Sequence, residues 1–160
     1  MFDFKIDAGD KPKMYAEMGQ ALEALVTGEP DAIANMANAS ALIWETLPEI
    51  NWAGFYRTID GELVLGPFQG RTACIRIPFG KGVCGAAAQT QETQLVADVH
   101  AFPGHIACDA ASRSEIVVPI MKDGAVIAVL DIDSPIPDRF DEEDKAGCEA
   151  LGRILEKALA

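Results

Sequence analysis

The sequence predicts an α+β fold in which helices pack on a mainly antiparallel sheet. Two helix-periodic segments come first, two hairpin signals occupy the middle, and one more helix-periodic segment comes last. Hairpins join strands antiparallel, and each helix has an apolar stripe that must be buried, so the helices are expected to cover the sheet. The chain has 160 residues, 49% of them hydrophobic, which suits a single domain over 1–160.

Three helices are expected from period and capping signals. The first covers 12–27, and the second begins after Asp31, a good N-cap residue, and ends at Pro48. The third covers 141–159, where Asp141 and Asp144 resemble a capping box. The stripes are Met14, Met18, Ala21, Leu22 and Leu25 on the first helix, and Ile33, Met36, Ala37, Ser40, Ile43 and Leu47 on the second.

The middle of the chain reads as strands and turns. Asp60-Gly61 and Lys122-Asp123-Gly124 each separate two strand-like runs and predict the two hairpins. Between the hairpins we expect a third strand at 73–79, a Gly-rich turn into a short Ala-rich helix at 80–91, a short strand at 94–99 and a long loop at 101–114.

Charge and hydropathy exclude several classes of partner. The formal net charge is −12 and the sequence pI is about 4.4, so nucleic acids and anionic membrane surfaces are disfavoured. The longest apolar runs, IVVPIM and AVIAVL, are too short to span a membrane. The acidic start MFDFKIDAGD is not a secretory signal, so we expect a cytoplasmic protein, where permanent disulfides are rare.

The four cysteines differ in their surroundings. Cys148 lies on the apolar stripe of the last helix and is expected to be a buried structural thiol. Cys84 is at a helix start, where the helix dipole can lower a thiol pKa, and Cys108 lies in the long polar loop. Cys74 falls on the expected third strand. Two of Cys74, Cys84 and Cys108 could be redox partners, and the alternative is that they fill the core.

A carboxylate cluster is possible at the second hairpin. Asp131 and Asp133 are two apart on a strand and face the same way. With a two-residue turn, Glu115 would oppose Ile132 and point away from both. A three-residue loop, or a bulge near Pro119, would set Glu115 opposite Asp131 instead. The cluster therefore requires one of these two devices; otherwise the acids are a solvated strand end.

Other candidate motifs indicate a pocket but no cofactor. Trp52 and Tyr56 share a strand face and are either core residues or the aromatic wall of a site for a small sulfur-bearing group. The G-x-G-x-x-G run at 80–85 lacks the parallel βαβ unit of a dinucleotide fold. His100 and His105, with Cys108, do not have a common zinc spacing. We therefore expect no organic cofactor and no resident metal.

Several long motifs resemble those of one enzyme family. NWAGFY, LGPFQG, CIRIPFGKGVCG, DVHAFPGHIACD, SEIVVPI, VLDIDSP and RFDEEDKAG are similar to the free methionine-(R)-sulfoxide reductases. These are single-domain enzymes with the GAF fold. The resemblance runs over nearly the whole chain, most densely from Asn51 to Lys145, and it implies one GAF-like domain over 1–160.

The resemblance also implies roles for individual residues. Cys108 matches the attacking cysteine, Cys74 matches the resolving cysteine that forms a disulfide with it, and Cys84 matches a third cysteine with an auxiliary role. Cys148 has no counterpart in the mechanism. Pocket residues matched in the family are Glu115, Asp131 and Asp133 on the acidic side and Trp52 and Tyr56 on the aromatic side.

The implied chemistry is the reduction of free L-methionine (R)-sulfoxide. Cys108 would attack the sulfoxide sulfur and become a sulfenic acid, Cys74 would condense with it, and thioredoxin would reopen the disulfide. We expect the 99–112 loop to move during this cycle, and family likeness suggests a homodimer. The alternative is a GAF module that binds a small ligand or senses oxidants without turnover.

Overall fold

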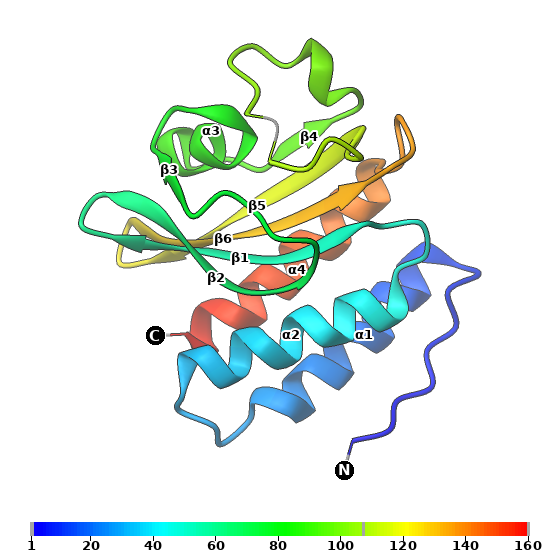
Figure 1. Cartoon of the computed structure of the whole chain (residues 1–160). Coiled ribbons are helices and arrows are strands. Elements are labelled where there is room, and N and C mark those ends of the chain that lie inside the picture. Colours follow the sequence, from blue (N-terminus) through cyan, green and yellow to red (C-terminus); the bar gives the residue numbers. More distant parts are fainter. Residues whose placement is uncertain (1, 107, 160) are drawn as a thin grey trace.

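A six-stranded sheet divides the molecule into two layers (Figure 1). The computed structural model describes residues 2–106 and 108–159. The sheet order is β3-β2-β1-β6-β5-β4, and every neighbouring pair is antiparallel. The elements are α1 (Lys11–Val26), α2 (Ala32–Thr46), β1 (Trp52–Ile59), β2 (Glu62–Gly70), β3 (Arg76–Pro78), α3 (Gly82–Thr90), β4 (Gln94–Val96), the 3-10 turn η1 (Val99–Ala101), β5 (Ser114–Lys122), β6 (Ala125–Ser134) and α4 (Glu142–Ala158).

One face of the sheet carries the main core. Helices α1, α2 and α4 cover it, as the apolar stripes predicted (Figure 1). Phe55 from β1, Ile116 from β5 and Leu130 from β6 point into this layer and are completely buried. Because side chains alternate along a strand, the next residues in each strand point to the other face. Ile33 and Ala37, both placed on the buried stripe of α2 by their spacing, are instead exposed, Ile33 at 46%, because the buried face of the helix is offset from that row. The buried residues of α2 are Asn35, Met36, Ala39, Ser40, Leu42 and Ile43.

The other face of the sheet holds a second core beneath α3. Its buried members include Trp52 and Tyr56 from β1, Val117 and Val129 from the central strands, and Cys84 from α3. The short helix α3 and residues 97–106 and 108–112 lie above this face in Figure 1. The predicted order of two helices, a sheet and a final helix is thus confirmed. Helix α3 covers the smaller core layer.

Helix ends follow the predicted capping signals. Asp31 caps α2, accepting a hydrogen bond from the Ala34 N–H, and Asp141 and Asp144 form a capping box at α4. The buried Asp144 also accepts a 2.7 Å hydrogen bond from the Tyr15 hydroxyl, which ties α4 to α1. Within the described ranges, no helix is both long and apolar enough to cross a bilayer.

The register of β5 and β6 differs from both registers considered from the sequence. The turn has two residues, and Lys122 pairs with Ala125, but the pairing shifts by one between Ile120 and Met121. The extra residue is Ile127 on β6, not a residue near Pro119 on β5. A bulge on this strand moves the register the opposite way, so Glu115 lies across from Asp133 rather than Asp131 or Ile132.

Candidate active site

Three carboxylates meet on the sheet face beneath α3. Glu115 pairs with Asp133 across the β5–β6 ladder, and Asp131 is two residues from Asp133 on the same strand, so all three project from one face. Trp52 on β1 pairs with Asp133 from the other side. The predicted carboxylate cluster is therefore present, although the β5–β6 register that forms it is neither of the two considered from the sequence.

Burial favours the protonated form of these three carboxyl groups. Glu115 is 8% exposed and Asp131 is 5% exposed, whereas Asp133 is half-buried as a residue with its Oδ1 buried. Removal from water raises the pKa of all three, and the charges of Asp131 and Asp133 raise the pKa of Glu115 further. Among the described residues, Asp131 Oδ1 and Asp133 Oδ1 are buried without a hydrogen-bond partner. The site is thus suited to holding protons or receiving a cationic group.

Cys84 is buried against the same cluster. It follows Gly82 and Val83 at the start of α3, where the sequence suggested a thiol with a lowered pKa. The structure corrects that expectation, because desolvation and the neighbouring carboxylates, Asp131 above all, raise the pKa of Cys84 well above its usual value. Cys84 is therefore a neutral thiol near neutral pH, and the helix terminus does not activate it.

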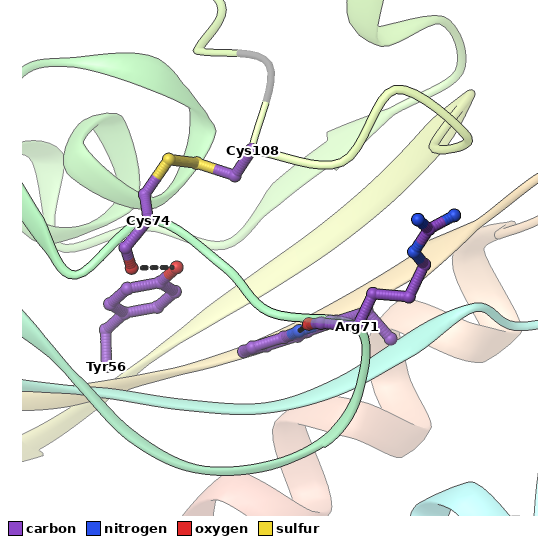
Figure 2. The surroundings of a disulfide bond; sticks show 5 residues. Tyr56, Arg71, Cys74 and Cys108 are labelled. Atoms are coloured by element: carbon purple, nitrogen blue, oxygen red, sulfur yellow. Dashed lines mark hydrogen bonds between the residues drawn. A yellow bond between two sulfur atoms is a disulfide. The ribbon is translucent and has the colours of Figure 1, made fainter.

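Cys74 and Cys108 form a disulfide at the mouth of this site (Figure 2). Their Cα atoms are 5.3 Å apart although 34 residues separate them in sequence. Cys74 was expected on a strand, but it lies in the loop before β3, which begins at Arg76. Cys74 and Cys108 are both half-buried. Cys84 and Cys148 are free, buried thiols.

The two pocket aromatics position the loop that carries Cys74. The Tyr56 hydroxyl donates a 2.9 Å hydrogen bond to the Cys74 carbonyl, directly below the disulfide in Figure 2. The Trp52 Nε1–H donates a 3.1 Å hydrogen bond to the Arg71 carbonyl. The rings stack with centroids 5.9 Å apart, and both are 2% exposed. Both rings line the cavity, as the sequence suggested, and both also support the loop that carries Cys74, which the sequence did not predict.

Asn51 links the Cys108 loop to the acidic strand, a contact that the sequence interpretation missed. Its side-chain amide donates 3.1 Å hydrogen bonds to Asp109 and to Ser112, while its backbone N–H donates to the Asp133 carbonyl. Its place directly before Trp52 in the NWAGFY motif was the available signal. Because Asp109 is adjacent to Cys108, these bonds hold the loop that carries Cys108 close to the acidic strand.

All eight candidate residues surround one cavity or support its wall. Its volume is about 40 Å³, enough for a few water molecules. Cys74 lies outside the cavity lining but is bonded to Cys108, which is part of it. The other polar and aromatic residues that line the cavity are Trp52, Tyr56, Lys81, Cys84, His105, Asp109, Ser112, Glu115, Asp131 and Asp133.

One trio in this cavity has donor atoms suited to a metal ion. Cys84, Glu115 and Asp131 each place a ligand atom within 4.8 Å of the others. A thiolate with two carboxylates is a possible Zn²⁺ ligand set. Metal binding requires deprotonated ligands, whereas burial raises the pKa of each member of this trio. Holding a metal here would therefore require all three groups to lose their protons.

Comparison with known proteins identifies the family. The chain matches the GAF domain family over residues 34–160. It is 52% identical to the free methionine-R-sulfoxide reductase of Escherichia coli over 94% of this chain and 92% of that protein. It is 46% identical to the yeast enzyme of the same name, over 93% and 87% of the two chains. The chain belongs to the free methionine-R-sulfoxide reductases.

One solved structure superposes on this chain over nearly its full length. The free methionine-R-sulfoxide reductase from Neisseria meningitidis, in complex with its substrate, superposes with a TM-score of 0.96 at 46% identity, covering 99% of this chain and 96% of that one. The α+β GAF fold and the family resemblance drawn from the motifs are thereby confirmed. In the present chain, a disulfide joins Cys74 and Cys108, the two cysteines that the resemblance paired.

Proposed function

We propose that the chain reduces free L-methionine (R)-sulfoxide to methionine, with Cys108 as the nucleophile. The observation that carries this proposal is the disulfide of Cys108 with Cys74 at the mouth of a buried carboxylate cluster. In the reduced chain the Cys108 thiolate attacks the sulfoxide sulfur, methionine departs, and Cys108 keeps the oxygen as a sulfenic acid. The Cys74 thiol then displaces water from that sulfenic acid to form the disulfide.

The carboxylates supply the proton that this attack requires. A sulfoxide sulfur becomes electrophilic when its oxygen accepts a proton or a strong hydrogen bond. A carboxylic acid can donate only while protonated, and burial beside two other acids raises the pKa of Glu115 accordingly. We assign Glu115 as the donor because it is enclosed by both aspartates. Asp133 is half-buried as a residue and its Oδ1 is buried without a hydrogen-bond partner among the described residues, so we assign it to the substrate's ammonium group.

Selection of the free amino acid follows from the same acids. Asp131 and Asp133 each have a buried oxygen without a partner among the described residues. A free ammonium group would fill that need, whereas a peptide-bound methionine sulfoxide has an amide and would leave these oxygens unpaired. Trp52 and Tyr56 form the apolar wall against which the substrate's methyl group would lie.

Loop movement and the auxiliary thiol complete the cycle. A cavity of about 40 Å³ is too small for an amino acid, so the segment that bears Cys108 withdraws when the disulfide opens. Cys84 acts as a buried hydrogen-bond donor toward Asp131 rather than as a second nucleophile. Thioredoxin is the dithiol that reopens the disulfide.

We take residues 1–160 as one functional unit. Helix α1 lies outside the segment that matches the GAF family, yet it is hydrogen-bonded to α4 inside that segment.

One assay separates the enzyme from a non-catalytic sensor. NADPH consumption is followed with thioredoxin and its reductase on free R-sulfoxide, free S-sulfoxide, peptide-bound sulfoxide and peroxide. Turnover restricted to the free R form is expected. Cys108→Ser should lower it by roughly a thousandfold or more, whereas the control Cys148→Ser, a buried thiol outside the pocket, should keep it. Full activity in Cys108→Ser, or no turnover on any sulfoxide, would overturn the proposal.

A further inference from the structure

The surface around Cys74 differs from the rest of the chain in two respects. Ile75, the residue after Cys74, is 67% exposed, which makes it the most exposed large apolar side chain among the described residues. Its carbonyl accepts a 2.9 Å hydrogen bond from the Leu65 N–H, so the backbone that presents it is fixed to β2. An apolar side chain held in water beside a reactive bond is a candidate contact for a protein partner.

Charge sets this surface apart as well. The segment 71–91 contains three of the 13 basic residues, Arg71, Arg76 and Lys81, and none of the 25 acidic ones. All three are exposed. Arg76 is paired with Glu62 at 2.7 Å, whereas Arg71 and Lys81 have no ion-pair partner within the described ranges. The chain has a net charge of −12, but the surface beside the disulfide lacks this excess of acidic residues.

We propose that Ile75, with the flanking Arg71 and Arg76, is the docking surface for an acidic dithiol protein that reduces the Cys74–Cys108 bond. The proposal rests on the reductase cycle described above and adds the surface by which the reductant is recognised. An acidic partner would be repelled by most of this molecule and admitted at this patch. Ile75 would supply the apolar contact at the centre of the interface, and Arg71 would supply the free rim charge beside the Arg76–Glu62 pair.

The docking geometry also selects the sulfur that is attacked. A partner seated on Ile75 lies beside Cys74, whereas Cys108 is on the segment tied toward the cavity through Asp109. The partner's thiolate attacks Cys74 Sγ, a new intermolecular disulfide forms, and Cys108 leaves as a thiolate that takes a proton from solvent. The partner's second thiol then attacks its own bonded sulfur and releases Cys74. The partner loses two electrons and this chain gains them.

The test measures reduction of the disulfide itself, without sulfoxide. The oxidised chain is mixed with reduced thioredoxin or with dithiothreitol, and free thiols are counted by alkylation and mass spectrometry over time. Ile75→Asp should slow reduction by thioredoxin by roughly tenfold and leave reduction by dithiothreitol unchanged. Ile33→Asp is the matched control, because Ile33 is 46% exposed on α2, across the sheet. It should behave as wild type with both reductants.

Two further measurements test the charge and the attacked sulfur. Raising the ionic strength from about 20 to about 300 mM should slow only the thioredoxin reaction, and Arg71→Ser should weaken that salt dependence. A thioredoxin with its second active-site cysteine replaced by serine should be trapped on Cys74. Equal loss with both reductants in Ile75→Asp, no loss with either, or trapping on Cys108 would overturn the inference. Because no sulfoxide is used, these results are independent of whether the chain turns over substrate.

Discussion

Glu115 on β5 lies directly across the ladder from Asp133 on β6, so two carboxylates form a cross-strand pair beneath α3. Like charges at such a position destabilise a sheet when both are ionised. The bulge at Ile127 creates this pairing, because without the extra residue Glu115 would point into the helical core. A costly arrangement that depends on a specific bulge is what a site for proton donation and ammonium binding requires.

Replacing Glu115 by glutamine should stabilise the chain at high pH while reducing its activity. The folded chain raises the pKa of Glu115, so as pH rises above about 4.3 the unfolded chain loses this proton first and stability falls. Glutamine has no proton to lose, so Glu115→Gln should unfold at a higher temperature than wild type at pH 8 and at a similar one at pH 4. Each kcal/mol corresponds to roughly 2–4 °C for a chain of this size.

Thermal unfolding followed by circular dichroism at several pH values measures this difference. Glu45→Gln, an exposed change on α2, is the control. A gap between Glu115→Gln and wild type that stays constant from pH 4 to pH 8 would argue against a protonated carboxyl. Full sulfoxide turnover by Glu115→Gln would assign the proton donor to another residue.

Loss of Cys74 should stop recycling but not the first chemical event. Cys74→Ser keeps Cys108, so one equivalent of methionine per chain is expected at a near-normal rate in a rapid-quench experiment. The Cys108 sulfenic acid then has no partner thiol and should be trapped by dimedone and seen by mass spectrometry. Cys148→Ser should behave as wild type, releasing methionine and cycling with thioredoxin without accumulating the trapped species, because Cys74 is still present. A Cys74→Ser chain that cycles normally with thioredoxin would assign the resolving role to Cys84.

Local chemistry was enough to predict much of the fold. Asp60-Gly61 predicted the first hairpin because both residues adopt the positive φ that a tight turn needs, and they do so here at 52° and 79°. Asp31 and Asp141 predicted two helix starts because their side chains reach free N–H groups. In each case the signal and its partner lie within a few residues of each other.

Features that depend on distant residues could not be predicted from the residues alone. The run AVIAVL contains no local mark for the residue that bulges, so the Glu115 register stayed open. The Cys84 pKa depends on burial against β5 and β6 rather than on its own helix. The resemblance supplied the pairing of Cys74 with Cys108, but the bonds of Asn51 appear only in the assembled site.

The two buried thiols should resist alkylation in the folded chain. Burial raises the pKa of Cys148 to about 12 and that of Cys84 well above its usual value, so neither is a thiolate at pH 8. The oxidised native chain should therefore take up no iodoacetamide over a time in which the same chain in guanidinium takes up two. After reduction with dithiothreitol, label should reach Cys108 and Cys74 first. Native labelling of Cys84 at a comparable rate would contradict its assignment as a neutral hydrogen-bond donor.

A pair of glycine substitutions should test how α1 packs on α4. A Cβ on Gly147 of α4 would lie 2.1 Å from Cγ of the Tyr15 ring, so Gly147→Ala must displace that buried ring and the hydroxyl that serves Asp144. A loss of about 2–3 kcal/mol is expected from overpacking. Gly19→Ala on α1 is the matched control, since its Cβ would meet Ile154 at an ordinary 3.5 Å. Because alanine has a higher helix propensity than glycine, Gly19→Ala should raise the free energy of unfolding by up to about 1 kcal/mol. Urea unfolding of both variants measures the contrast, and similar midpoints would show that α1 is only loosely attached to α4.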